Sequence, residues 1–294
     1  MKKENVSDVQ GVKQNQLLEF WKQYRRNRGA VIGLIVLVLI LLIAIFADVL
    51  WEYDTEIIGM NGMDRLIKPC WEHPLGTDNY GRDMLARIGY GTRYSVILGV
   101  SAVCIAAIIG IPIGAASGYI GGKADSIIMR CVDIFATIPT MMMAILLVTI
   151  LGNSLGSLAV ALSVGSIPVM ARITRSSVMM VRNNEYIEAA RAIGAPTYRI
   201  IMKHILPNCF SPILVNSTLR VGVAITATAG LSYIGLGVPI PLPEWGSLLT
   251  SSKSYMLDAP HMLIFPGIAL IITVMMINLV GDGVRVALDP KLKR

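Results

Sequence analysis

Long apolar runs separated by short polar segments dominate this chain. Spanning about 30 Å of hydrocarbon takes roughly 20 apolar residues in a helix. Six windows of about that length are present, at residues 29–50, 95–119, 127–151, 155–171, 211–237 and 262–280. The fourth window is short, and the third and fifth carry charges. The pattern therefore predicts an all-α membrane protein with about six transmembrane helices.

Composition supports a membrane protein, since 54% of the residues are hydrophobic and only 15% are charged. The first 28 residues hold seven Lys or Arg, and residues 172–203 hold six more. Residues 51–94 have five basic residues against seven acidic ones. Because cytoplasmic segments carry the excess of Lys and Arg, six crossings place both termini in the cytoplasm. This bias accounts for the net charge of +7 without a nucleic-acid partner.

The topology divides the chain into five parts. We expect a cytoplasmic N-terminal segment at residues 1–28, a first transmembrane helix at 29–50 and an extracytoplasmic segment at 51–94. A core of five transmembrane helices follows at 95–285, and a cytoplasmic tail at 286–294. No small-residue cleavage site closes the first apolar run, which predicts a retained anchor rather than a removable signal peptide.

Candidate chemistry is sparse. The four cysteines show no CxxC spacing, and the three histidines are scattered, so neither predicts a metal site or a catalytic triad. Gly122-Lys123 is similar to the end of a phosphate-binding loop, but Ser117 replaces the required glycine and Ala124 the hydroxyl residue. We expect no cofactor in this chain, and any ATP-driven step must draw on another subunit.

One polar, helix-prone segment interrupts the apolar sequence at residues 185–207, and it predicts a helix, a turn and a second helix. Residues 185–193 favour a helix, Gly194 and Pro196 favour a sharp turn, and residues 197–205 favour a second helix. Pro207 should prevent that helix from continuing smoothly into the membrane. An ordinary amphipathic loop on the membrane surface is the alternative interpretation.

Within this segment, Glu188-Ala189-Ala190, Gly194 and Leu206-Pro207 resemble the EAA loop of ABC-importer permeases. His204 stands where isoleucine is usual. Further motifs are similar to those of the dipeptide, oligopeptide and nickel permeases: HPLGTD at 73–78, GRD at 81–83, RYS at 93–95, LSYIGLG at 231–237 and WG at 245–246. The resemblance covers roughly residues 20–294.

The resemblance implies a type I ABC-importer permease fold and alternating access in a prokaryotic cell membrane. The implied partners are a second homologous permease, two cytoplasmic ATP-binding subunits that hold ATP and magnesium, and an extracytoplasmic substrate-binding protein. The cargo would be a di- or oligopeptide, with nickel or another small solute as the alternative. Thr228 and Val286 stand where many relatives have carboxylates, so no role of those carboxylates transfers to this chain.

The same resemblance implies that the cytoplasmic loop at 182–208 couples the permease to the ATP-binding subunits. Glu188 would make a polar contact with the partner, and Gly194 would form the turn that fits its cleft. The alternative for Glu188 is a surface ion pair with Arg191, three residues along the helix. The coupling residues would be Glu188, Ala189, Ala190, Gly194, His204, Leu206 and Pro207.

Charges inside the predicted spans need protein or water around them, because an unpaired charge at mid-membrane costs several kcal/mol. Arg220 lies near the middle of the fifth window. It either contacts a substrate carboxylate on the translocation path, or forms a structural ion pair or extends to the interface. Arg130 and Asp133 are three residues apart and share a helix face. The polar loop argues against an ion-coupled secondary transporter. The absence of a catalytic constellation in the sequence argues against a membrane-embedded enzyme.

Overall fold

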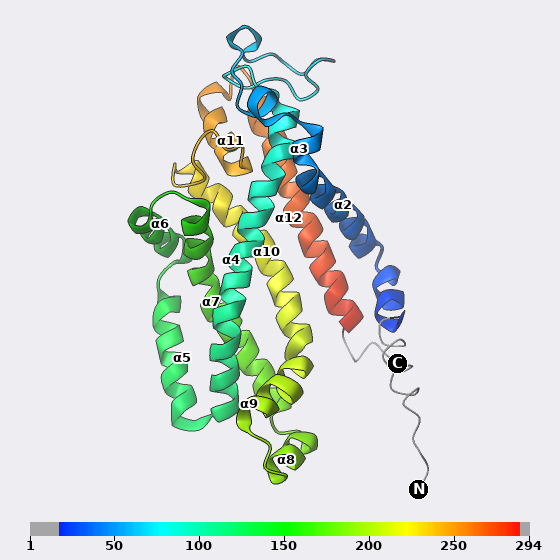
Figure 1. Cartoon of the computed structure of the whole chain (residues 1–294), viewed down its shortest axis with the longest axis vertical. Helices are drawn as coiled ribbons and strands as arrows, with labels where there is room; N and C mark the ends of the chain where they lie inside the picture. The colour runs from blue at the N-terminus through cyan, green and yellow to red at the C-terminus, as the bar shows by residue number, and fades with distance from the viewer. Residues whose placement is uncertain (1–17, 289–294) are drawn as a thin grey trace.

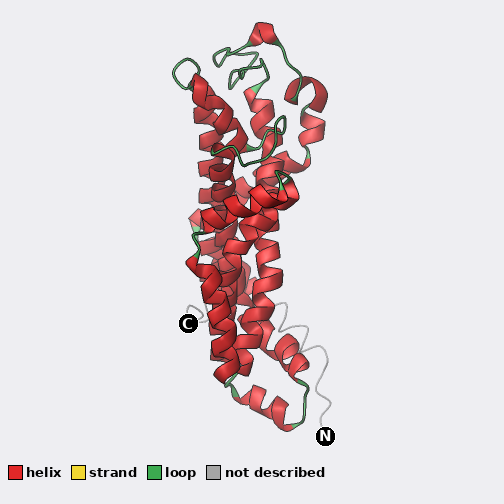
Figure 2. Ribbon diagram, turned by 90° about the vertical axis from the view of Figure 1, so that its left-hand side faces the viewer, coloured by secondary structure: helices red, strands yellow, loops and turns green. Residues whose placement is uncertain are grey.

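The protein is an elongated bundle of helices that run along one long axis (Figures 1 and 2). The computed structural model describes residues 18–288. Five helical stretches in this part of the chain are long and apolar enough to cross a membrane. They are α2 (Arg28–Ile45), α4 (Met84–Ile120), α7 (Leu155–Val181), the stretch Thr197–Tyr233 that contains α10 (Phe210–Tyr233), and α12 (His261–Leu288). The all-α prediction is confirmed.

The third apolar window is not the single helix that residues 127–151 predicted. It contains most of α5 (Gly122–Thr137) and all of α6 (Thr140–Leu151), which meet at an angle of 82°. Ile138 and Pro139 are both extended, with ψ of 126° and 128°. The proline ring clashes with a helical conformation of the preceding residue, so the helix ends there. Residues 18–288 therefore contain six candidate spans if this bent pair counts as one.

Several helices extend beyond their apolar windows. α4 begins at Met84 rather than at residue 95, and the Asp83 side chain caps it by accepting from the Ala86 N–H. α7 continues to Val181, so Arg172 belongs to this helix and not to a loop. Helices continue where hydropathy ends because their polar ends can still form backbone hydrogen bonds.

The first window is also divided. α2 ends at Ile45, and the short helix α3 (Ala47–Leu50) completes this region.

The centre of the bundle is the close packing of α4 against α7. A side chain at Gly114 of α4 would meet the Ala171 carbonyl oxygen at 2.2 Å, so the two backbones touch there. Leu98, Leu158 and Met170 fill the surrounding core. This pair provides the rigid frame to which both ends of the molecule are attached.

The two ends differ in composition and structure (Figure 1). One end, here called the α8 end, carries α8 (Glu185–Ala192), α9 (Thr197–Ile200) and the irregular turns η3 (Ile201–Ile205) and η4 (Leu206–Cys209). The other, the α11 end, carries η1 (Tyr53–Ile57), η2 (Gly62–Asp64), α11 (Trp245–Ser252) and η5 (Lys253–Tyr255).

Candidate functional site

The predicted helix–turn–helix forms at the α8 end. The helix α8 ends at Ala192, and Gly194, two residues later, is left-handed, with φ +75°. The Gly194 N–H donates to the Arg191 carbonyl at 2.9 Å, and the Ala195 N–H donates to the Ala190 carbonyl at 3.1 Å. These two bonds make a Schellman motif, which satisfies the last carbonyls of the helix. The turn is therefore fixed by local hydrogen bonds that need a glycine at this position.

The loop is anchored by its inward face. Ile187, Ala190, Ile200 and Ile205 are all buried against the core between α4, α7 and α10. Ala190, a predicted coupling residue, thus holds the loop in place rather than forming part of its surface.

Three of the predicted coupling residues, Glu188, Ala189 and Gly194, lie on the outward face and are exposed. Two exposed apolar side chains lie beside them that the sequence interpretation missed. Ile193 is 85% exposed and Tyr198 is 74% exposed. The sequence did offer a signal for them, because they are large apolar residues on the two sides of a glycine turn in an otherwise polar segment. The outward face combines a carboxylate, a small turn and apolar anchors, which is a composition suited to protein contact.

Arg191 does not pair with Glu188 in the described structure. Its Nε donates to the Tyr119 hydroxyl at 3.3 Å, and its guanidinium carbon lies 4.9 Å from the centre of that ring. The surface ion pair considered for Glu188 is therefore not formed. Arg191 instead connects α8 to the last turn of α4.

His204, Leu206 and Pro207 lie in a continuous helical path rather than at a break. A wide turn, η3, is followed by the tight turn η4. Helical dihedrals are found at Ile200, Ile205, Leu206, Cys209 and Phe210. The wider turn accommodates Pro207, which has no N–H to donate. Pro207 makes the helix irregular, as predicted, but does not end it.

A second set of contacts lies directly above the loop. The Arg175 Nε and Nη2 atoms of α7 donate to the two carboxylate oxygens of Asp125 on α5, both at 2.6 Å. Ser117 of α4 also donates to Asp125, and Arg182 donates to the Gly118 carbonyl at 2.7 Å. These bonds fasten α4, α5 and α7 to one another beside the loop.

Of the charges in the third and fifth predicted spans, only Asp133 forms an ion pair in the described part of the chain. Asp133 binds Arg172 of α7 at 2.8 Å, whereas Arg130 is exposed and forms no ion pair among the described residues. Arg220 of α10 is half-buried and likewise has no ion pair in the described part of the chain. Arg220 lies apart from the coupling loop, and its role on a path stays a prediction.

Two family models match this chain, one over about its C-terminal two thirds and one near its N-terminus. The family described as "binding-protein-dependent transport system inner membrane component" matches residues 110–294, which is more than half of the sequence. The chain belongs to this family. The N-terminal TM domain of oligopeptide transport permease C matches residues 15–69.

Relatives of this permease align along nearly its whole length. The dipeptide transport system permease protein DppC of Alkalihalophilus pseudofirmus is 42% identical, over 94% of this chain and 90% of its own. The oligopeptide transport system permease protein OppC of Bacillus subtilis is 40% identical, over 99% and 95%. The glutathione transport system permease protein GsiD of Pectobacterium atrosepticum is 41% identical, over 94% and 91%. All three are named as permeases and not as enzymes.

A solved structure supports the fold of this permease. A chain of the methionine ABC transporter MetNI, in an inward-facing conformation, superposes with a TM-score of 0.59. It is 23% identical, over 70% of this chain and 98% of that chain. The predicted type I importer permease fold is confirmed.

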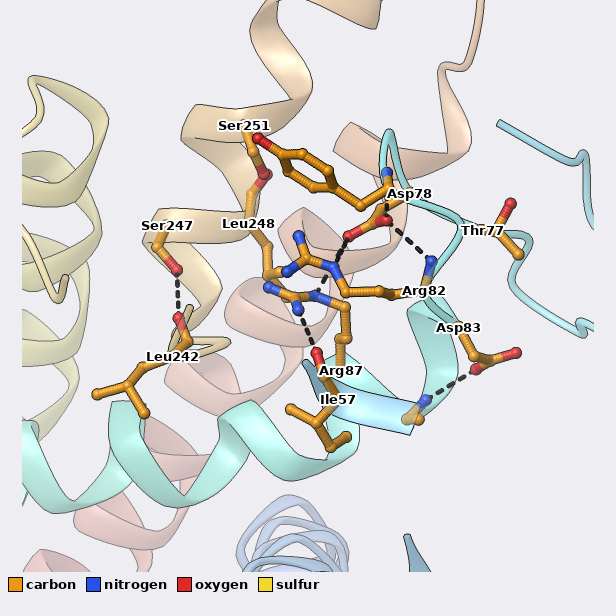
Figure 3. Close-up of polar contacts among 12 residues, drawn as sticks. Ile57, Thr77, Asp78, Arg82, Asp83, Arg87, Leu242, Ser247, Leu248 and Ser251 are labelled. Carbon is orange, nitrogen blue, oxygen red and sulfur yellow. Dashed lines mark hydrogen bonds and ion pairs between the residues drawn. The ribbon is translucent and has the colours of Figure 1, made fainter. Parts of the chain in front are cut away.

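At the α11 end of the permease, Asp78 of the HPLGTD motif and Arg82 of the GRD motif form a buried charge cluster with Arg87 of α4. Asp78, Arg82 and Arg87 are each at most 3% exposed. Figure 3 shows both guanidinium groups converging on Asp78, with Nε of Arg82 at 2.7 Å and Nε of Arg87 at 3.5 Å from Oδ2. Arg87 also donates to the Ile57 carbonyl at 2.5 Å. One carboxylate thus holds two cations and fixes residues 51–83 on the start of α4.

A second buried carboxylate fixes α11 of the permease. Glu244 is 1% exposed and accepts hydrogen bonds from the hydroxyls of Ser232 at 2.8 Å and Ser95 at 3.3 Å. The adjacent Trp245 donates from Nε1 to the Ile88 carbonyl at 3.0 Å. Since Ser95 and Ile88 belong to α4 and Ser232 to α10, this end is cross-linked through all three helices.

Proposed function

We propose that this permease imports di- or oligopeptides that an extracytoplasmic binding protein delivers. The cargo is supported by the names of relatives about 40% identical over the chain, which transport dipeptides, oligopeptides and glutathione. Nickel or another small solute gains no support from these names. Two cytoplasmic ATP-binding subunits hold ATP and magnesium and supply the energy, and a homologous second permease forms the other half of the path.

We further propose that the α8–α9 loop is the contact with the ATP-binding subunits. The observation that carries this proposal is the exposed left-handed turn at Gly194, with Ile193 and Tyr198 beside it. Apolar side chains exposed to water at the end of a membrane bundle are unfavourable unless a partner covers them. In this account Ile193 and Tyr198 enter a cleft of the ATP-binding subunit, Gly194 and Ala189 allow close approach, and Glu188 makes a polar contact at its edge.

The side of the membrane follows from charge. The α8 end carries Arg182, Arg191, Arg199 and Lys203, and by the positive-inside rule this basic excess supports a cytoplasmic position for this end. In this account the start of α2 and the end of α12 lie on the same cytoplasmic side, and the α11 end faces the binding protein (Figure 1).

Movement of the loop reaches the membrane helices through two kinds of connection. His204, Leu206 and Pro207 lead without a helix break from α9 into α10, so displacement of α9 moves α10 directly. On the other side, Arg191 of α8 holds Tyr119 of α4. A push on one small loop therefore acts on two helices of the bundle at once, which is what alternating access requires.

The test is to purify the tagged chain gently from its native membrane with its partners. The ATP-binding subunits and a second permease should be recovered with it, and Glu188→Lys should reduce the recovery of the ATP-binding subunits. Asp258→Lys is the matched control, because it makes the same charge change at an exposed position at the α11 end. Equal recovery with both variants, or recovery of the chain alone, would contradict the proposal.

A further inference from the structure

One face of α5 is polar over its whole length. Positions spaced by three or four residues fall on the same side of a helix. The polar positions are Ser126, Arg130, Asp133 and Thr137, all exposed or half-exposed. The opposite face is apolar and consists of Ile127, Ile128, Cys131 and Phe135. The helix is thus amphipathic, with its polar face uncovered in this chain.

This polar face lies at membrane depth. Figure 1 shows α5 upright beside α7 and not lying across the end of the bundle, as a surface helix would. Asp133 is eleven residues beyond Gly122, the first residue of α5, or about 16 Å along the axis at 1.5 Å per residue. A charged, exposed face at that depth cannot contact lipid at tolerable cost, so it faces water or protein.

The bend that follows α5 leads to the same conclusion. Every residue from Ile134 to Met142 is exposed, including the extended pair Ile138 and Pro139. No side chain caps the first turn of α6. Backbone groups left unpaired at a helix break are not tolerated against lipid, but they are tolerated beside a water-filled cavity.

The Asp133–Arg172 ion pair lies on this face and is only about half covered by the rest of the protein. The two side chains are 47% and 49% exposed, although their charged atoms are 2.8 Å apart. The other ion pair between α5 and α7, Asp125–Arg175, is much less exposed, at 12% and 32%, and is held by two short hydrogen bonds. The Asp133–Arg172 pair can therefore still bind a further charged group. The Asp125–Arg175 pair instead holds α5 against α7.

We propose that the polar face of α5, with Arg172 of α7, lines the water-filled translocation path, and that Asp133 and Arg172 contact the charged termini of a passing peptide. A peptide with free ends carries an ammonium and a carboxylate, which complement a carboxylate and a guanidinium. Between transport events Asp133 and Arg172 neutralise each other. Each end of a peptide must therefore compete with this ion pair, so the peptide binds only weakly and can move on. This inference rests on the proposed import of peptides.

The first test measures contact with water in the assembled transporter, in inside-out membrane vesicles. Thr137→Cys should react with a charged, membrane-impermeant thiol reagent, read site by site by mass spectrometry. The native Cys131, six residues before it on the apolar face, is the internal control and should react far more slowly. Equal protection of both thiols would show that lipid or a partner covers the polar face, and would overturn the proposal.

The second test measures contact with peptide in the same vesicles. A dipeptide with free termini should slow the labelling of Thr137→Cys about two- to fivefold, the size expected of one exposed ion pair. The same dipeptide acetylated at its N-terminus and amidated at its C-terminus should protect less. Adding Asp133→Asn together with Arg172→Gln should remove the difference between the two peptides, whereas adding Asp125→Asn should lower the amount of protein but keep the difference.

Equal protection by both peptides, or a difference that survives Asp133→Asn together with Arg172→Gln, would overturn the peptide contact. Failure of the proposed function appears separately, as absence of peptide uptake by intact cells that contain the unmodified transporter. Labelling of Thr137→Cys still decides in that case whether the polar face of α5 is in water.

Discussion

The two ends of this permease differ in how their main structural features are covered. At the α8 end, Ile193 and Tyr198 are exposed and a side chain added at Gly194 would meet nothing within 4 Å. At the α11 end, Asp78 and Glu244 are buried and hydrogen-bonded to several elements. Paired buried charges hold the α11 end in one shape, whereas the uncovered, preformed turn of the α8 end is available to a partner. Changes at the α8 end should therefore damage coupling, and changes at the α11 end should damage folding.

The largest effect should follow Gly194→Val. A β-branched side chain in the left-handed region costs roughly 1–2 kcal/mol and would reshape the turn. Since no neighbour occupies the space, the loss should fall on the contact with the ATP-binding subunit and not on folding. We expect uptake of peptide to fall to background while the amount of chain in the membrane is unchanged.

Gly194→Asn is the matched control for this change, because asparagine tolerates the left-handed conformation. It should keep a substantial part of the uptake. Normal uptake by Gly194→Val would contradict the role of the turn.

The next largest effect should follow Asp78→Asn, and on stability. The change leaves Arg82 and Arg87 buried without a countercharge, and breaking a buried ion pair in this way costs about 3–5 kcal/mol. Thermal unfolding of the purified complex should begin at a clearly lower temperature, and less chain should reach the membrane.

Asp48→Asn provides the comparison at the same end. Asp48 pairs with Arg93 but is 61% exposed, and an exposed pair is worth at most about 1 kcal/mol. Equal destabilisation by both variants would show that the buried cluster has no special part in holding this end.

A smaller effect should appear in the pH dependence of stability. Burial raises the pKa of Glu244 from its ordinary value of 4.5. The folded state then binds the proton more tightly than the unfolded state, so this contribution to stability is present below the ordinary value and is lost as pH rises above it. Glu244→Gln should flatten that slope, measured by thermal unfolding at several pH values. An unchanged slope would mean that other groups cause it.

Local sequence features predicted much of the structure. Apolar length predicted the spans, and Gly194 with Pro196 predicted the turn, because both depend on residues close together in the chain. The bend between α5 and α6 had a visible local cause in Pro139, but the apolar run on both sides concealed it.

The ion pairs could not be predicted in the same way. Asp133 and Arg172 are 39 residues apart, and Asp125 and Arg175 are 50 apart. Their pairing depends on how α5 and α7 are rotated toward each other, which helical periodicity alone does not determine. The exposure of Ile193 and Tyr198 and the burial of Ala190 likewise follow from the position of the loop against the bundle.

In the proposed transporter, the turn at Gly194 lies in a cleft of the ATP-binding subunit. The most direct measurement replaces Ile193 with a photo-crosslinking benzophenone residue in the assembled transporter. Leu257, 92% exposed at the α11 end, carries the same residue in a parallel sample. We predict that irradiation joins position 193 to the ATP-binding subunit and that position 257 never forms this product. Absence of that product from position 193, in a complex that retains its ATP-binding subunits, would contradict the account.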